Sequence, residues 1–398
     1  MNLISVKEAT QIILNNSENF GVETIALTQT LGRVLKESVF ADRDFPPFDR
    51  VSMDGIAISK ASFDKGIRSF KIENIQAAGK EQISLNNPNN CIEAMTGAVL
   101  PINTDVVIPY EQVTIENGIA TVLINEIDYL KNVHLKGFDK KENSLLLSEN
   151  TIIGAAEIGI LATVGKTQIK VAKKPNIAII STGDELVEID QRPKPFQIRK
   201  SNVYSVLALL NDLKLDAEIF HLNDHKEILL KEVDKILKDF DILIFSGGVS
   251  KGKFDFLPQI LEKLEVKKCF HSVQQKPGKP FWFGKKENKT VFAFPGNPVA
   301  TFLNFIKYFK PWYLKSMGLN VESNNFAILE DDFTFKADLT YYLQVKISNK
   351  DGVLFAKPYT GNGSADLANL ADADGFLELT AKQSEFKKGS SFPYLPYR

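Results

Sequence analysis

The chain has 398 residues, 44% of them hydrophobic, which is enough for about two to four domains with substantial cores. Its 48 Lys and Arg residues nearly balance its 49 Asp and Glu residues, so the formal net charge of −1 gives no global reason to expect a nucleic-acid partner. The two cysteines show neither CxxC spacing nor a neighbouring metal-ligand pattern, which argues against a disulfide framework or a zinc module.

The beginning of the chain does not have the pattern of a signal peptide, because Lys7 and Glu8 interrupt its early apolar residues. No stretch approaches the roughly 20 apolar residues of a membrane span. We therefore expect an unprocessed, soluble protein of the cytoplasm, without a membrane or nucleic-acid partner.

The first predicted element is a short amphipathic helix after Ser5, because Ser5-Val-Lys-Glu8 has the spacing of a capping box. Residues 42–133 form short alternating runs separated by turn residues, which is typical of a mainly β domain. A helical pattern returns near residues 155–164. The β domain is therefore expected to be inserted into a linker domain made of residues 1–41 and 134–172.

Residues 173–318 alternate apolar strand-like runs with helical stretches, the rhythm of a parallel sheet with crossover helices. After residue 318 helical periodicity fades and short strands alternate with turns, so residues 319–398 are expected to form a C-terminal β domain. The predicted fold class is a multidomain α/β protein with a parallel-sheet core domain, an inserted β domain and a mixed linker domain.

Three loop signatures gather in the core domain: Ser246-Gly-Gly-Val-Ser-Lys-Gly252 with Asp255 beyond it, Lys276-Pro-Gly-Lys-Pro280 and Pro295-Gly-Asn-Pro298. The first and third follow buried apolar runs, and open α/β sheets bind ligands at such strand ends. Glycine turns let backbone N–H groups approach an anion, and Asp255 adds an oxygen ligand for a divalent cation. A tight turn alone would explain the glycines, and a solvated loop would explain the lysines. We favour a phosphate or oxyanion site; no Walker pattern is present to imply nucleotide hydrolysis.

Two adjacent carboxylates follow another buried run in Ser181-Thr-Gly-Asp-Glu-Leu186. They are well placed for a cation that bridges phosphates, and Asp224 could face the same cleft. Two further motifs are Arg50-Val-Ser-Met-Asp54-Gly and Thr96-Gly-Ala98. Taken alone, the first is more typical of a plain turn and the second of a hairpin, and they indicate function only in combination with the other motifs.

Taken together, these six motifs resemble the MoeA family, the molybdopterin molybdenumtransferases, which include the E domain of gephyrin. Their order and spacing match across nearly the whole chain. The resemblance implies an elongated homodimer of four-domain subunits, with a MogA-like molybdopterin-binding α/β domain and a C-terminal domain that resembles a β-barrel. The family's activity is the Mg2+-dependent insertion of molybdate into adenylylated molybdopterin with release of AMP. The resemblance also implies transient contact with a MogA-type adenylyltransferase and with molybdoenzyme apoproteins.

The resemblance also assigns roles to residues. The catalytic residues are expected to be Asp54, Glu185, Asp255, Lys276 and Lys279. The residues expected to contact the substrates are Thr96, Ser181, Thr182, Gly183, Ser246, Gly247, Gly248, Ser250, Gly252, Pro295, Gly296, Asn297, Pro298, Thr301 and Ser364. Mg2+ is expected at Asp184, Glu185, Asp224 and Asp255.

The sequence departs from the family at two places on the molybdate side. Ala300 stands where family members usually have serine, and residues 338–344 contain no arginine where the family often has two. A non-catalytic molybdopterin-binding or scaffolding protein therefore stays open as an alternative. A pterin adenylyltransferase is a third reading, disfavoured by the four-domain length.

Overall fold

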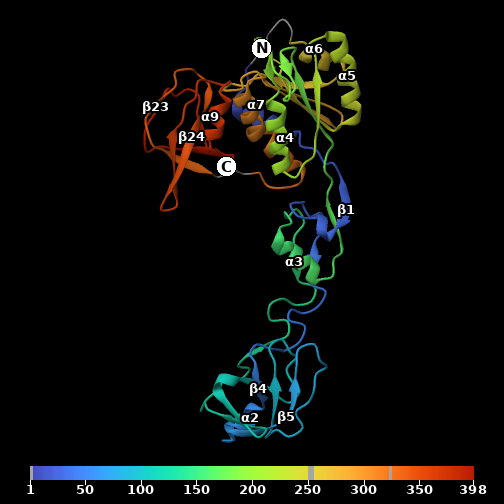
Figure 1. Cartoon of the computed structure of the whole chain (residues 1–398), viewed down its shortest axis with the longest axis vertical. Helices are drawn as coiled ribbons and strands as arrows, with labels where there is room; N and C mark the ends of the chain where they lie inside the picture. Colours follow the sequence, from blue (N-terminus) through green and yellow to red (C-terminus); the bar gives the residue numbers. More distant parts are fainter. Residues whose placement is uncertain (1–2, 250–254, 322–324) are drawn as a thin grey trace. The chain divides into compact units, whose positions relative to one another are not determined.

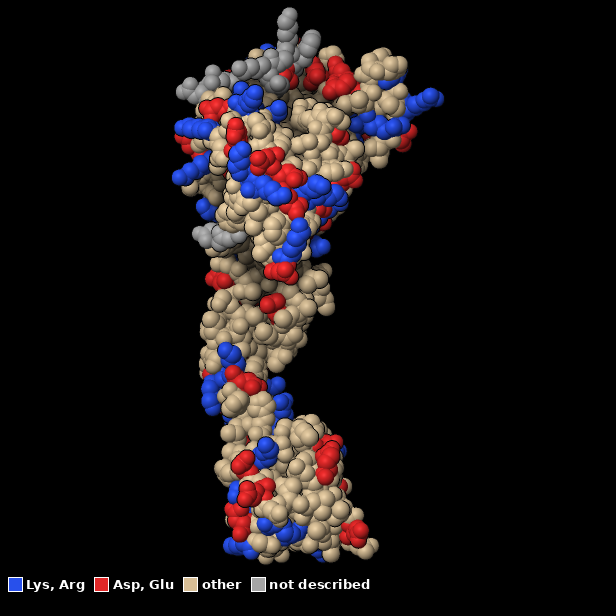
Figure 2. Space-filling model, turned by 90° about the vertical axis from the view of Figure 1, so that its left-hand side faces the viewer, with Lys and Arg blue, Asp and Glu red and all other residues tan. Residues whose placement is uncertain are grey.

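The computed structural model describes residues 3–249, 255–321 and 325–398, and the chain forms two compact units (Figure 1). Unit 1 comprises residues 1–25, 32–36 and 170–398, and unit 2 comprises residues 26–31 and 37–169. Basic and acidic side chains are interspersed over the face of each unit that Figure 2 shows. Within the described ranges, no helix is both long and apolar enough to cross a membrane.

Unit 2 is built around a six-stranded sheet. In spatial order its strands are β7 (Val106–Pro109), β4 (Gly55–Ile58), β6 (Cys91–Ala94), β5 (Ser69–Gln76), β9 (Ile119–Val122) and β8 (Val113–Glu116). The core behind the sheet contains Ile56, Phe70 and Ile108, all fully buried, together with Phe63 of the short helix α2 (Lys60–Asp64). Two small strand pairs and the helix α3 (Ala155–Thr163) complete the unit.

Unit 1 opens with helix α1 (Val6–Asn15), and its predicted capping box is confirmed. The Ser5 hydroxyl accepts a hydrogen bond from the Glu8 N–H at 3.1 Å, and the Glu8 carboxylate accepts one from the Ser5 N–H at 2.8 Å. Val6, Ala9 and Ile13 lie three or four residues apart and are buried, so one face of the helix joins the core of the unit.

The centre of unit 1 is a second six-stranded sheet. Its spatial order is β16 (Glu218–Leu222), β13 (Ile177–Thr182), β17 (Ile242–Ser246), β21 (Lys289–Phe294), β20 (Trp282–Lys286) and β18 (Lys267–His271). The first four strands are parallel, and the last two are antiparallel additions at one edge. The two central parallel strands β13 and β17 are buried along their whole length, because both faces of the sheet are covered there.

Two separate hydrophobic cores lie on the two faces of this sheet. Ile177 and Ile179 point to the core shared with α4 (Asn202–Asp212), α7 (Pro298–Asn304) and α8 (Lys310–Ser316). Ala178 and Ile180, on the opposite face of β13, pack in the core shared with α5 (Lys226–Asp239) and α6 (Leu257–Lys263). The sheet is therefore the middle layer between the two cores, and the ends of its strands are left accessible to solvent or ligand.

The C-terminal part of unit 1 is a closed β structure. Its ring runs through β24 (Thr340–Lys350), β25 (Val353–Pro358), β22 (Phe326–Leu329), β28 (Ser391–Pro396) and β26 (Gly375–Leu379), and β26 pairs back to β24. The short strand β19 (Gln275–Lys276) adds to the edge of β24, so it ties the lysine motif to this barrel. A small helix, α9 (Leu367–Asp372), follows β25.

Candidate functional site

The carboxyl ends of three neighbouring strands meet at one edge of the α/β sheet. Ser181 of β13 is in register with Ser246 of β17, which is in register with Phe294 of β21. The loops that follow these strands border a pocket of 690 Å³. The predicted site residues that line it are Ser181, Thr182, Gly183, Glu185, Asp224, Ser246, Gly247, Gly248, Asp255, Pro295, Gly296, Asn297 and Pro298. Residues from three separate sequence motifs thus share one cavity.

The glycine turn after β17 is folded around the end of β13. Gly247 has a φ of +107° and Gly248 a φ of +71°, and a Cβ on either would lie 2.9 Å from Thr182 Oγ1. Thr182 is buried, and its hydroxyl has no hydrogen-bond partner within the described part of the chain. Glycine is required here because a side chain would collide with Thr182. The turn leaves a buried hydroxyl beside backbone that can approach an anion.

The carboxylates of Asp184, Glu185, Asp224 and Asp255 belong to the same region, and their charges affect the pKa of Asp224. The pKa of Asp224 is raised to about 6, first by burial and then by the negative charges of Asp184, Glu185 and Asp255. The Asp224 N–H donates to Asp184 Oδ1 at 3.1 Å, which joins the two acidic loops. In residues 3–249, 255–321 and 325–398, no three Asp, Glu, His or Cys side chains are arranged to hold a metal ion by themselves.

The Pro295–Pro298 turn forms another wall of the pocket. Asn297 Nδ2 donates to Ser364 Oγ at 2.8 Å, and the Val299 N–H donates to the Ser364 carbonyl at 3.1 Å. Ser364 therefore braces this turn, although it does not itself line the large pocket. Thr301 is buried and its hydroxyl donates a hydrogen bond to Pro295 O at 2.6 Å, so it stabilises the buried side of the turn.

The two lysines of the Lys276–Pro280 motif lie outside the large pocket. Both are exposed, and Lys276 Nζ lies 5.5 Å from the centre of the Phe335 ring. Lys276 lines a separate small pocket of 40 Å³, as do Ser364 and three residues of the arginine-free segment, Tyr341, Tyr342 and Gln344. Lys279 lines neither of these two pockets.

The remaining predicted residues lie elsewhere. Ser250 and Gly252 are outside the described residues. Asp54 and Thr96 belong to unit 2, where the structure brings them together: the Thr96 N–H donates to Asp54 Oδ1 at 2.6 Å. This backbone hydrogen bond is the main reason that the pKa of Asp54 is lowered, so its carboxylate is ionised at neutral pH.

Asn202 is a pocket residue that the sequence reasoning missed. It is the first residue of α4, and its side-chain amide donates to Ser246 Oγ at 2.9 Å and to Gly296 O at 2.7 Å. One amide therefore connects the end of β17 to the turn after β21. The sequence signal was Ser201-Asn202 directly before an apolar helical pattern, a typical helix start.

Lys200 is a second missed residue of the large pocket. Only 5% of its surface is exposed, and its ammonium is paired with Glu188. Buried lysines are rare unless paired, so a cation is built into this wall. The sequence offers no local reason to select this lysine among the 48 basic residues of the chain.

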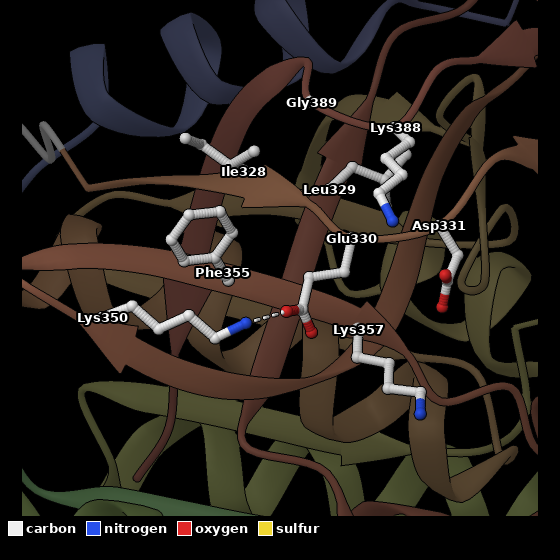
Figure 3. A pocket seen from close by; sticks show the side chains of 9 residues that line it. All are labelled: Ile328, Leu329, Glu330, Asp331, Lys350, Phe355, Lys357, Lys388 and Gly389. Carbon is white, nitrogen blue, oxygen red and sulfur yellow. Dashed lines mark hydrogen bonds and ion pairs between the residues drawn. The ribbon is translucent and has the colours of Figure 1, made fainter.

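Another hollow lies on the C-terminal barrel (Figure 3). This pocket of 360 Å³ is lined by side chains from β22, from the end of β24, from β25 and from neighbouring turns. Its Lys350 is paired with Glu330 at 2.8 Å, and none of the predicted site residues that the structure describes lines it. The strand-end pocket is therefore the candidate functional site.

Comparison with known proteins agrees with this architecture. The MoeA N-terminal region (domain I and II) matches residues 4–165, the family described as "Probable molybdopterin binding domain" matches residues 178–315, and the MoeA C-terminal region (domain IV) matches residues 327–397. A molybdopterin molybdenumtransferase of Synechocystis sp. is 41% identical over 397 residues, covering 98% of this chain and 99% of that protein. The chain belongs to the MoeA family.

Other MoeA relatives extend the comparison. A molybdopterin molybdenumtransferase of Staphylococcus epidermidis is 31% identical over 97% of this chain and 94% of that protein. The crystal structure of the molybdopterin biosynthesis MoeA protein from Pyrococcus horikoshii OT3 superposes with a TM-score of 0.84 at 25% identity, covering 100% of both chains. The predicted family and the predicted fold class are thus confirmed.

Proposed function

We propose that this chain is a molybdopterin molybdenumtransferase that inserts molybdate into adenylylated molybdopterin and releases AMP. The chain is a transferase of molybdenum cofactor biosynthesis, as its MoeA relatives are by name. The observation that carries the finer proposal is the strand-end pocket, in which a glycine turn, acidic loops and a buried hydroxyl that has no partner in the described ranges lie together. That combination suits a substrate with a phosphate group and a metal counter-ion.

The glycine turn and Thr182 would bind the phosphate end of the substrate. Gly247 and Gly248 allow close backbone approach, and the Thr182 hydroxyl, which has no hydrogen-bond partner in the part of the chain that the structure describes, can donate to a phosphate oxygen. Lys200 adds a buried positive charge on another wall of the cavity. These groups favour binding of the anionic end of a ligand in this part of the pocket. The nearby carboxylates repel a second anionic group that is not accompanied by a cation.

The carboxylates fit a Mg2+ ion that arrives with the diphosphate. Mg2+ keeps several waters and commonly takes only one or two protein carboxylates besides phosphate oxygens, so three preformed protein ligands are not required. The residues that would hold it are Asp184, Glu185, Asp255 and Asp224, whose pKa is raised first by burial and then by the charges of the other three. When bound, the ion would offset charge on the diphosphate as AMP departs.

The lysine turn would attract molybdate. Lys276 is exposed beside Ser364, and the small pocket that they share is bordered by Tyr341 and Gln344, from the segment that lacks the family's arginines. Ala300 is buried with 1% exposure, and Thr301 already donates to Pro295 O. Binding of the oxyanion would therefore depend on Lys276 and Lys279 more than on the altered positions.

The test is a defined reaction. Purified protein is incubated with adenylylated molybdopterin, molybdate and Mg2+, AMP is measured by chromatography, and cofactor is measured by activating an apo-molybdoenzyme. We expect both products, and absence of both would refute the proposal. If AMP is released but no active cofactor forms, the proposed hydrolysis is supported and the proposed insertion of molybdate is refuted.

Asp255→Asn separates binding from turnover. It should still bind molybdopterin but release AMP much more slowly, because an amide is a poorer Mg2+ ligand than a carboxylate. The matched control is Asp234→Asn on α5, where the carboxylate is paired with Lys238 at 2.5 Å and lies outside the pocket. Equal turnover by both variants would remove Asp255 from the mechanism.

The same proposal includes where and with what the protein acts. We expect a cytoplasmic homodimer that receives its substrate from a MogA-type adenylyltransferase and passes the product to molybdoenzyme apoproteins. In this proposal Asp54 is a catalytic residue and Thr96 a residue that contacts the substrate. Sedimentation equilibrium tests the dimer, and a monomer that retains full activity would contradict it.

A further inference from the structure

A buried polar network lies beneath the lysine turn. Gln275 and Asn304 are 0% exposed and Tyr308 is 1% exposed, although all three carry polar side chains. Gln275 belongs to β19, Asn304 is the last residue of α7, and Tyr308 lies in the π-helical turn Phe305–Phe309 that follows α7. Burying such groups is costly unless they are hydrogen-bonded, so their contacts define their role.

Gln275 is the centre of this network. Its Nε2 donates to Pro277 O at 3.0 Å and to Asn304 Oδ1 at 2.8 Å, with a longer contact of 3.5 Å to Gly278 O. Its Oε1 accepts the hydroxyl proton of Tyr308. Burial raises the pKa of Tyr308 well above its ordinary value, so the phenol remains a donor. The amide thus connects the helix to the backbone between the two lysines.

The turn is shaped to sit on this network. Gly278 has a φ of +87°, and a Cβ there would lie 2.9 Å from both Gln275 Nε2 and Asn304 Oδ1. The Val273 N–H closes the base of the turn by donating to Lys279 O at 2.9 Å. The backbone that carries Lys276 and Lys279 is therefore bound on its inner side, while both lysine side chains are exposed.

We propose that Gln275, Asn304 and Tyr308 are positioning residues that fix the lysine turn for binding of a tetrahedral oxyanion. The proposal rests on the proposed function, because it takes molybdate as the oxyanion. Flexible lysines bind an anion more tightly when the backbone that carries them is already ordered, since less freedom is lost on binding. Asn304 also closes α7, whose first residue, Pro298, lines the phosphate-side pocket. One short helix thus supports both parts of the site.

The central variants are Tyr308→Phe and Gln275→Met. The first removes only the hydroxyl that donates to Gln275, and the second keeps a similar volume but removes the donor to Pro277 O. The control is Tyr313→Phe, a buried tyrosine of the same core whose ring stacks on Phe309. Tryptophan fluorescence of Trp282 and Trp312, both buried in the same domain, checks that each variant is folded.

Three measurements are made on each full-length variant. Molybdate alone is titrated by calorimetry, the molybdate concentration for half-maximal cofactor formation is measured with kcat, and hydrogen exchange is followed at the Val273 amide. We expect Tyr308→Phe and Gln275→Met to weaken molybdate binding and raise the half-saturating concentration about tenfold, the effect of one lost hydrogen bond. We expect kcat to change less than about twofold and Val273 exchange to rise about tenfold. Tyr313→Phe should match the wild type in all three.

The outcomes separate this inference from the proposed function. Wild-type cofactor formation with unchanged molybdate affinity in both variants overturns the positioning role alone. Faster exchange at Val273 without weaker molybdate binding also overturns it, because the network would then order a turn that the oxyanion does not use. If the wild-type protein binds molybdate but forms no cofactor, only the proposed function fails, and the affinity and exchange of the variants still decide the positioning role. Failure of the wild type to bind molybdate overturns the positioning role as well.

Discussion

Replacing Gly248 with alanine tests whether the glycine turn is shaped around Thr182. An added Cβ would lie 2.9 Å from Thr182 Oγ1 and 3.5 Å from Leu257 Cβ, on a backbone with a φ of +71°. The left-handed conformation alone costs an alanine about 1–2 kcal/mol. Crowding against a buried hydroxyl adds about 1 kcal/mol. We therefore expect Gly248→Ala to lower the free energy of unfolding by about 2–3 kcal/mol.

Thr182→Ala is the matched background for this change. The Thr182 hydroxyl has no hydrogen-bond partner among the described residues, so its removal breaks no hydrogen bond and costs only the lost packing, about 1 kcal/mol. In this background the Cβ added at position 248 no longer meets Oγ1. The double variant should then lose about 1 kcal/mol less than the sum of the two single losses.

Urea unfolding followed by tryptophan fluorescence measures these differences within the right domain. Both tryptophans of the chain, Trp282 and Trp312, are buried on the two faces of the α/β sheet. Losses that add to within about 0.3 kcal/mol would refute the direct contact between the turn and Thr182. The same variants should bind phosphate-containing ligands more weakly, because the contact lies in the pocket itself.

Three further predictions concern charge, connectivity and thiol reactivity. Folding raises the pKa of Asp224 to about 6, so the ionised carboxylate destabilises the folded state above pH 6 and has no such effect well below the unfolded pKa of 3.8. Asp224→Asn should therefore stabilise the protein by up to about 1 kcal/mol at pH 7.5, after solvent screening, and not at all at pH 3. Urea unfolding at both pH values measures the difference. Asn202→Asp removes the donor to Ser246 and Gly296 and should cost about 1–3 kcal/mol, whereas Asn211→Asp, on the exposed face of α4, should cost less than about 0.5 kcal/mol; equal effects would contradict the bridging role. Burial first, and then Glu93, raise the pKa of Cys91 to about 12, so a thiol reagent at pH 8 should label Cys91 only after unfolding, and rapid labelling of the native protein would count against its burial.

The strand ends of the site were predictable because their signals are local. Apolar runs followed by glycine and acidic residues identify buried strands and the loops after them, and the structure brings Thr182, Gly247 and Asp255 into one pocket as expected. Parallel pairing aligns the carboxyl ends of neighbouring strands, so separate motifs had to meet at one edge.

The contacts that support the site were not predictable, because they join residues that are far apart in the sequence. Asn202 contacts Gly296 across 94 residues of sequence, and Tyr308 contacts Gln275 across 33. Ser201-Asn202 indicates only a helix start, and Tyr308 belongs to no recognisable motif. An amide or a phenol near an apolar run is equally compatible with the surface. Only the packing of α4 and of the segment after α7 against the sheet selects them.

Helix α7 sets the distance between the two proposed anion-binding regions. Pro298 at its start lines the phosphate-side pocket, and Asn304 at its end supports the lysine turn. Seven residues at 1.5 Å each span roughly 10 Å, so the two regions suit a ligand that carries a phosphate at one end and meets an oxyanion some distance away. A free phosphate or a short diphosphate would occupy only the first region. The proposed arrangement therefore favours an extended substrate over a small anion, and in it the buried contacts of α7 would support the exposed lysines.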